Sequence, residues 1–323
     1  MICSRLAVKL PQIICKLHPM ISAMTLILGV ALTMVVLHKT RAPLLLGLTA
    51  LLLSLLGCTS TNYGDDQFQL RMATHGKDIM WMPTKVETTH EMLTLAGVRS
   101  TDILYDLGSG DGVIPIEAAK LYGVRAYGIE YNPNLVALSI RNAQRAKVHN
   151  LVNFKQGDIF VEDFSQATVL TLFLGESLNT RLMPTILKMK PGTRVVSNTF
   201  RMESWIADRE IKTRPGETIY LWIVPANIDG LWVMSGLPKG DTANLVIRQK
   251  KQLFDGSIDT SMMSHARRTI YFEDGRITGQ HIEFAFKDSQ NSYIFKGQMS
   301  AGQLTGILNN DPKLPVIANR PRR

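Results

Sequence analysis

The chain has 323 residues, of which 45% are hydrophobic and 20% are charged, a composition that suits one or two globular domains and excludes a disordered chain. The formal net charge is +9, but residues 1–57 carry +5 of it and residues 311–323 carry +3. Only +1 is left for the residues between them, so we expect no broad phosphate-binding face and no nucleic acid partner.

Cysteine and histidine are placed in a way that argues against metal chemistry. The three cysteines, Cys3, Cys15 and Cys58, all precede the globular part, so we expect no disulfide framework and no cysteine metal site. The seven histidines are scattered, and the sequence "HEML" at His90 lacks the second histidine of a zincin helix. The sequence therefore predicts no metal site.

Residues 1–58 are interpreted as a signal or membrane-anchor segment. They contain two apolar stretches, at 20–37 and 42–58, and the second is short for a membrane span of about 20 residues. Lys39 and Arg41 precede its run of leucines, as in a secretion signal, and its final "LLGC" resembles the lipobox of bacterial lipoproteins. That resemblance implies lipidation at Cys58, with residues 59–79 as a polar tether.

Two alternatives remain open for this region. One is an uncleaved membrane anchor, and the other is a true start at Met34, which would leave a compact signal peptide. In either form, Lys39 and Arg41 precede the segment whereas Asp65 and Asp66 follow it. The positive-inside rule then predicts a membrane-associated protein whose globular part faces the periplasm, and an anchor facing the cytoplasm is the remaining alternative.

Residues 80–225 alternate short β-rich runs with segments of helical periodicity. The segments "VIPIEAAKLYG", "PNLVALSIRNAQRAKV" and "LNTRLMPTILKMKPG" carry apolar residues at helical spacing and stop near Gly or Pro. Strands that alternate with crossover helices predict an α/β fold with a doubly wound, mostly parallel, Rossmann-like sheet. The predicted strands are 103–108, 125–131, 152–158, 168–174 and 193–200, with 218–225 as a closing strand.

Candidate functional groups follow four successive predicted strands. The loop from Asp106 to Gly112 follows the first strand, Glu130 closes the second, Asp158 closes the third, and Glu176 comes just after the fourth. Ligands of such sheets bind at the carboxyl ends of the strands, so we expect these groups to share one site.

The loop "DLGSGDG" spaces its glycines as G-x-G-x-G, unlike the G-x-G-x-x-G of dinucleotide folds, and an acid precedes it. An acid here would repel pyrophosphate and would suit a ligand with a cationic ammonium group. The segments "DLGSGDG", "GIEYNP" and "QGDIF" resemble motifs I, II and III of class I S-adenosylmethionine-dependent methyltransferases. The resemblance implies S-adenosyl-L-methionine as cofactor, bound by Asp106, Gly108, Ser109, Gly110, Asp111, Gly112, Glu130, Tyr131, Asp158 and Ile159.

A closer resemblance covers residues 80–225. The segment "MWMPTKVETTHEMLTLAGV", with the run from "TVLTLFLGES" to "IYLWIVP", is similar to a small group of membrane-anchored protein-lysine methyltransferases known from mitochondria, with bacterial relatives. It implies that residues 82–84, "MPT", fold over the cofactor. The fourth strand ends in "FLGES" and lacks the N-P-P-Y type signature, which disfavours methylation of adenine or glutamine.

Substrate-side residues are assigned by position. Glu176 is the candidate general base for a lysine acceptor, and its alternative role is a carboxylate at a helix N-terminus. Thr84, Asn198 and Phe200 are candidate substrate or lid contacts.

Residues 226–310 read as a small antiparallel β region, a meander or partial barrel, with D-G turns at 255 and 274. It would shape the substrate entrance, bind a partner, or only cover a sheet edge. Residues 311–323 are expected to form a solvated basic tail.

The preferred function is methyl transfer from S-adenosylmethionine to a nucleophile, with a protein lysine amine as the named candidate. Two alternatives stay open: a methyltransferase for a small molecule or an envelope lipid, and a non-catalytic lipoprotein that uses a methyltransferase fold for binding.

Overall fold

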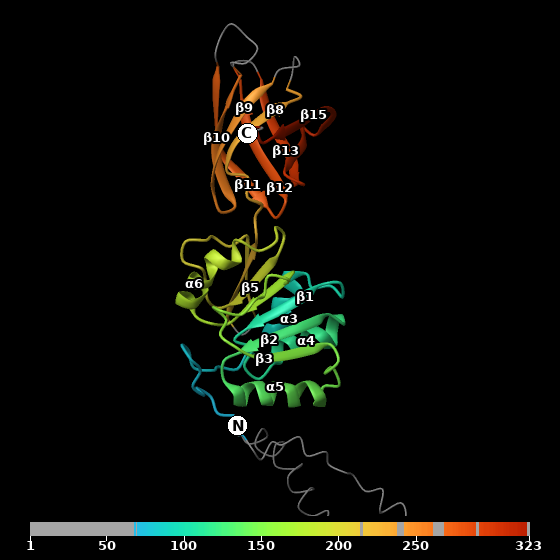
Figure 1. Cartoon of the computed structure of the whole chain (residues 1–323), viewed down its shortest axis with the longest axis vertical. Coiled ribbons are helices and arrows are strands. Elements are labelled where there is room, and N and C mark those ends of the chain that lie inside the picture. Colours follow the sequence, from blue (N-terminus) through green and yellow to red (C-terminus); the bar gives the residue numbers. More distant parts are fainter. Residues whose placement is uncertain are drawn as a thin grey trace, which may run out of the picture. The chain divides into compact units, whose positions relative to one another are not determined.

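The computed structural model describes residues 68, 70–213, 216–237, 242–260, 268–288 and 291–321. The predicted signal segment, the lipidation site at Cys58 and the start at Met34 lie outside the described residues. Within these residues, no helix is long and apolar enough to span a bilayer. Figure 1 shows the elements of an α/β domain and of a β domain.

The α/β domain is built on a seven-stranded sheet in the order β3-β2-β1-β4-β5-β7-β6. Strands β1 to β5 are parallel, and β7 joins antiparallel to β5. The predicted doubly wound, mostly parallel sheet is confirmed, and β6 is an edge strand that the prediction missed. The strands are β1 (Ile103–Leu107), β2 (Arg125–Glu130), β3 (Val152–Gln156), β4 (Val169–Leu172), β5 (Arg194–Asn198), β6 (Arg209–Lys212) and β7 (Thr218–Ile223).

Helices cover both faces of this sheet. Side chains of α3 (Val86–Ala96), α4 (Val113–Tyr122) and α5 (Pro133–Arg145) join one apolar core, whereas α6 (Glu176–Ile186) joins a second core on the opposite face. Leu104 of β1 belongs to the first core and Leu107 to the second, as expected when successive side chains of a strand point to opposite faces. All four residues of β4 are buried, which is typical of a parallel strand covered on both sides.

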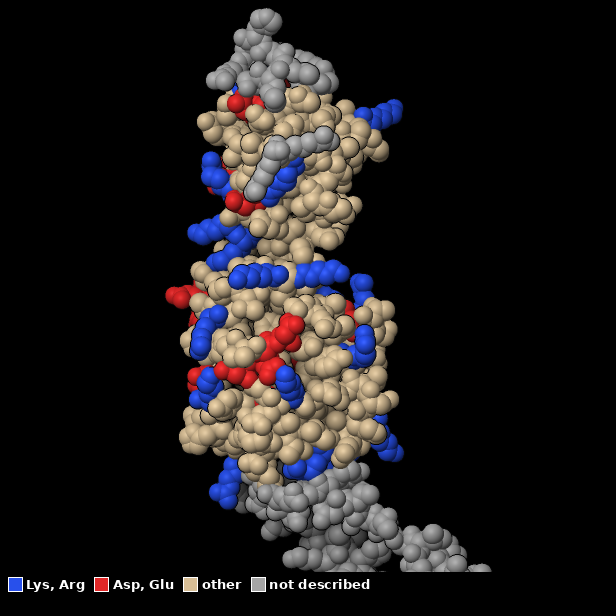
Figure 2. Space-filling model, viewed as in Figure 1, with Lys and Arg blue, Asp and Glu red and all other residues tan. Residues whose placement is uncertain are grey.

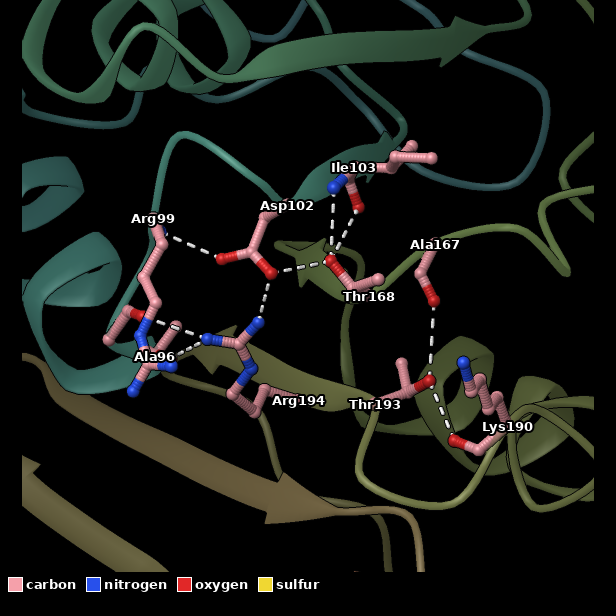
Figure 3. Close-up of polar contacts among 10 residues, drawn as sticks. Ala96, Arg99, Asp102, Ile103, Ala167, Thr168, Lys190, Thr193 and Arg194 are labelled. Atoms are coloured by element: carbon pink, nitrogen blue, oxygen red, sulfur yellow. Dashed lines mark hydrogen bonds and ion pairs between the residues drawn. The ribbon is translucent and has the colours of Figure 1, made fainter.

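A polar network joins the start of β1 to the chain that leads into β4 and to β5, away from the strands' carboxyl ends (Figure 3). Asp102 accepts a hydrogen bond from the Thr168 hydroxyl at 2.7 Å and forms an ion pair with Arg194. Arg194 also donates to the carbonyl oxygens of Ala96 and Gly97, at 3.1 and 2.8 Å, where α3 ends. The pair is largely buried, since the side chains of Arg194 and Asp102 are 21% and 8% exposed.

The β domain is a closed barrel of eight antiparallel strands, so the expected meander or partial barrel is corrected to a complete one. Each strand pairs with the next along the chain, and β15 pairs with β8 to close the ring. Phenylalanine side chains pack against each other inside, with ring centroids 4.6 to 6.0 Å apart. The strands are β8 (Gly230–Ser235), β9 (Ala243–Lys250), β10 (Leu253–Asp259), β11 (Thr269–Thr278), β12 (His281–Lys287), β13 (Ser292–Ser300), β14 (Gln303–Leu308) and β15 (Asp311–Asn319).

The segment that was expected to be a solvated tail from residue 311 provides the closing strand. Val316 and Ala318 of β15 are buried in the barrel core. The guanidinium of Arg320 lies 4.1 Å from the ring centroid of Trp232 and donates to the carbonyl oxygen of Asp229 at 2.5 Å. Pro312 and Pro315 within the strand and the arginines that follow it made this strand hard to predict, and only Val316 and Ala318 among its side chains are fully buried.

The surface is mixed in charge on the face drawn in Figure 2, where Lys and Arg side chains are spread out and interspersed with Asp and Glu. The described residues contain no group of three or more His, Cys, Asp or Glu side chains that could hold a metal ion.

Candidate cofactor and acceptor site

A cavity of about 370 Å³ lies at the carboxyl ends of β1 to β5 and is bounded on one side by residues 76–84. This is the position in which open α/β sheets bind their ligands. It brings together nine of the ten predicted cofactor residues and two of the three predicted substrate residues, Thr84 and Phe200. The nine are Asp106, Gly108, Ser109, Gly110, Asp111, Glu130, Tyr131, Asp158 and Ile159.

The three glycines of the loop all have positive φ, at 73°, 55° and 83°, where other residues are strained. A Cβ on Gly108 would come within 2.5 Å of the Leu174 side chain, and one on Gly110 within 2.4 Å of the Trp81 indole. The glycines are therefore needed both for the turn and for close packing around the cavity. Gly112, the tenth predicted cofactor residue, is outside the lining and precedes the first residue of α4.

The Glu130 carboxylate is fixed by two backbone amides. Its Oε2 accepts a hydrogen bond from the Gly110 N–H at 2.9 Å, and its Oε1 accepts one from the Asn132 N–H at 2.8 Å. Each carboxylate oxygen can accept a further bond, so the side chain can receive two hydroxyl groups of a ligand such as the ribose of a nucleoside.

Asp106 is buried, at 3% exposure, at the end of β1. The pKa of its carboxyl group is raised to about 7, chiefly by burial and also by the nearby charges of Glu130 and Asp111, while a 2.6 Å hydrogen bond from the Thr171 hydroxyl opposes the rise. Burial also raises the pKa of Asp111. These carboxyl groups have no compensating cation in the lining except Lys77, so a cationic ligand would complement them.

Residues 73–81 form a hairpin beside the cavity, so residues 73–79 of the predicted tether belong to the folded domain. The backbone N–H of Trp81 donates to the Thr74 carbonyl oxygen at 2.8 Å. The Lys77 ammonium lies 2.6 Å from Asp158 Oδ2. The hydrogen bond from Lys77 lowers the pKa of Asp158. The turn sequence "HGKD" was the available signal for this hairpin. We call residues 73–84 the lid segment.

The Ser109 side chain adds an unsatisfied polar atom to the part of the cavity lining that the glycine loop forms. It is 4% exposed, it lines the cavity, and its Oγ has no hydrogen-bond partner in the described residues. Together with the glycine turns, the fixed Glu130 carboxylate and the acidic Asp106, this suits a cationic nucleoside without phosphate. The residues present therefore fit S-adenosylmethionine.

The other end of the cavity is apolar and aromatic. Phe173, just after β4, stacks on Phe200, just after β5, with ring centroids 5.8 Å apart and an angle of 26° between the rings. Leu178 and Thr199 complete this end, and sequence reasoning missed Phe173, Leu178 and Thr199. We call these four residues the acceptor end; Thr84, the other predicted substrate residue in the lining, belongs to the lid segment.

Two of the residues predicted on the substrate side lie outside the cavity lining. Asn198 is 1% exposed and lies behind Thr199, whose hydroxyl donates to Asn198 Oδ1 at 3.0 Å. Glu176 is exposed and lies outside the cavity lining. It is the first residue of α6, which fits its alternative role as a carboxylate at a helix N-terminus. Its role as general base stays a prediction.

The fold and the cavity define an S-adenosylmethionine-dependent methyltransferase, and comparison with known proteins agrees. The ANTKMT methyltransferase domain family matches residues 106–209. A protein-lysine N-methyltransferase from Saccharolobus islandicus is 38% identical over 151 residues, which cover 45% of this chain and 94% of that protein. The chain belongs to this protein-lysine N-methyltransferase family.

Another relative matches over a shorter share of the chain, and a solved structure matches over a similar share. A lysine N-methyltransferase of Mus musculus whose name specifies ATP synthase is 37% identical over 106 residues, 32% of this chain, and the chain spans 42% of that relative's length. The crystal structure of an RNA methyltransferase from Salinibacter ruber with S-adenosyl-L-homocysteine shares 47% identity, with a TM-score of 0.44, over 46% of this chain and 96% of that chain.

Proposed function

We propose that this methyltransferase acts on the side-chain amine of a lysine in a protein. The observation that carries the proposal is one cavity with two different ends: an acidic, glycine-lined wall and an aromatic acceptor end. The lysine specificity in the name of the Saccharolobus relative supports the same acceptor.

When bound, S-adenosylmethionine supplies an electrophilic methyl group on a positively charged sulfur. Asp106 and Glu130 would hold the cofactor, with Asp158 and Ile159 beside them, and the lid segment would exclude water from the cavity. The acceptor end would position the incoming amine, which is the main contribution that such a transfer requires of the protein.

The acceptor end suits a lysine side chain in shape and chemistry. Its Leu178, Phe173 and Phe200 side chains can pack along an aliphatic stem, and aromatic ring faces attract a cationic amine. Among the described residues, none that we assign to the acceptor end is ionisable. We therefore propose that the amine loses its proton to solvent before transfer, so that the rate rises with pH toward the amine's own pKa of about 10.4.

The proposal is tested by incubating the full chain with cell protein and S-adenosylmethionine that carries a labelled methyl group. Label on lysine side chains, located by mass spectrometry and absent with a Glu130→Ala chain, would support it. Label in lipid or in small molecules would instead favour the second enzyme function, and cofactor binding without any transfer would favour the binding-only alternative.

For location, we propose that the enzyme is membrane-associated through residues 1–58. The support is the apolar sequence and the lipobox-like "LLGC" that ends at Cys58. An exported enzyme would need a supply of S-adenosylmethionine outside the cytoplasm, so the side of the membrane decides where the acceptor is found. Protease treatment of spheroplasts tests this: cleavage of the globular domain places it outside, and protection places it inside.

A further inference from the structure

The acceptor end contains a residue in a rare backbone conformation. Thr199 has a φ of 65°, and the Phe200 N–H donates to the Asn198 carbonyl oxygen at 2.7 Å, which closes a three-residue γ-turn centred on Thr199. A β-branched residue is strongly disfavoured at positive φ, where glycine or asparagine is the usual choice. The strain is thus located at a residue that lines the cavity.

Contacts on both sides hold this turn in place. The Thr199 N–H donates to the carbonyl oxygen of Thr218, at the start of β7, at 2.7 Å. The amide of Asn179, a fully buried residue of α6, donates to Ser197 Oγ at 3.0 Å and to the Phe200 carbonyl oxygen at 3.1 Å. The two neighbouring elements therefore fix the turn.

The hydroxyl of Thr199 has a defined direction. It donates its proton to Asn198 Oδ1 at 3.0 Å, and Asn198 is buried. With its proton committed, the hydroxyl oxygen can only accept hydrogen bonds, while the Thr199 side chain itself is exposed at the cavity. The Phe173 and Phe200 rings line the same end.

We propose that Thr199 is the residue that binds the methyl-acceptor nitrogen, by accepting a hydrogen bond from one of its N–H groups. An acceptor-only oxygen beside two aromatic rings selects an amine and disfavours a carboxylate or thiolate, which could offer it no hydrogen. Such a bond also orients the nitrogen so that its lone pair is free for transfer. This inference rests on the proposed methyl transfer to an amine and adds the residue that selects it.

A purely structural role for Thr199, in which its hydroxyl only satisfies Asn198, predicts a different outcome. In that case, substitutions would change the melting temperature and leave the kinetics with the acceptor unchanged in the folded fraction.

Three variants separate these roles. Thr199→Val keeps the branched shape without the hydroxyl, Thr199→Ser keeps the hydroxyl, and Thr199→Gly relieves the positive φ while it also removes the hydroxyl. Because Thr199→Val leaves Asn198 Oδ1 without its donor, we expect that variant to melt lower than wild type. Thr199→Gly loses the same donor but also loses the strain, so it should melt close to wild type and serves as the folded control.

The experiment measures kcat and KM for transfer to protein, together with the cofactor Kd by calorimetry and the melting temperature of each chain. We expect Thr199→Val and Thr199→Gly to lower kcat/KM for the acceptor about tenfold, which corresponds to the loss of one hydrogen bond. Thr199→Ser should stay within about twofold of wild type, and the cofactor Kd should be unchanged in all three variants. Equal kcat/KM for Thr199→Val and wild type, or a parallel loss of cofactor affinity, would overturn the proposal.

Failure of the proposed function would look different. Wild-type chain that labels lipid or a small molecule overturns the lysine assignment, and the Thr199→Val chain compared on that same fraction still decides the role of the hydroxyl. A wild-type chain that binds the cofactor and labels nothing overturns both.

Discussion

Replacing Asp106 with asparagine should change how cofactor affinity depends on pH. Asp106 is 3% exposed, and its pKa is about 7 in the folded protein against 3.8 when unperturbed. The rise from 3.8 to about 7 means that the folded protein disfavours the ionised carboxyl group by roughly 4 kcal/mol relative to the unfolded chain, and the burial leaves little solvent screening to reduce this cost.

The direction in which stability changes with pH depends on which state of the chain binds the Asp106 proton. Between about pH 4 and about pH 7 the folded protein keeps the Asp106 proton that the unfolded chain has lost, so stability falls as pH rises and levels off above about 7. A cationic ligand favours the ionised carboxyl group, so its binding has the opposite dependence on pH. Cofactor affinity should therefore rise with pH up to about 7 and then stay constant.

The variant Asp106→Asn removes the titration and keeps an oxygen that can accept from Thr171, which now donates to Asp106 Oδ1. We expect its cofactor affinity to be about ten- to hundredfold weaker than wild type above pH ~7 and independent of pH, while the ligand-free chain becomes more stable at alkaline pH. Calorimetric titration with S-adenosylmethionine from about pH 5 to about pH 9, with thermal melts of the free chains, measures both effects. A wild-type affinity that does not change with pH across this range would show that Asp106 does not control cofactor binding, as would a variant that keeps the wild-type pH profile.

Three other substitutions test separate parts of the structure. Gly110→Ala places a Cβ 2.4 Å from the Trp81 indole at a φ of 55°, so we expect it to abolish cofactor binding measured by calorimetry. Trp81→Ala should weaken cofactor binding but leave the melting temperature of the free chain nearly unchanged; a large drop in that temperature would make Trp81 a core residue rather than part of the lid segment. Arg194→Ala leaves the buried Asp102 without its cation and should lower the free energy of unfolding by about 3 kcal/mol in urea denaturation, with the cofactor Kd unchanged in the folded chain.

The cofactor-binding side of the cavity could be predicted from sequence because its residues directly follow strands. A parallel strand and its succeeding turn are local signals, and the carboxyl ends of neighbouring strands meet at one edge, so Glu130 and Asp158 could be placed together from spacing alone. The positions of Gly108 and Gly110 followed from their freedom at positive φ.

The parts that escaped prediction depend on long-range contacts. The lid hairpin is short, and the pairing of Lys77 with Asp158, 81 residues later, holds it beside the cavity. Nothing local in "SNTF" indicates a positive φ at Thr199, because the Asn179 amide and β7 impose it. The barrel was read as partial because closure needs β15 to return to β8, and the proline-rich sequence of β15 disfavours an interior strand.

We propose that one cavity holds S-adenosylmethionine and delivers its methyl group to a lysine amine. The most direct measurement is a transfer assay with labelled S-adenosylmethionine and cell protein, followed by mass spectrometry that locates each added methyl group. We expect methyl groups on lysine Nζ atoms with the wild-type chain and none with Glu130→Ala. Methyl groups on any other kind of acceptor, or equal labelling by Glu130→Ala, would contradict it.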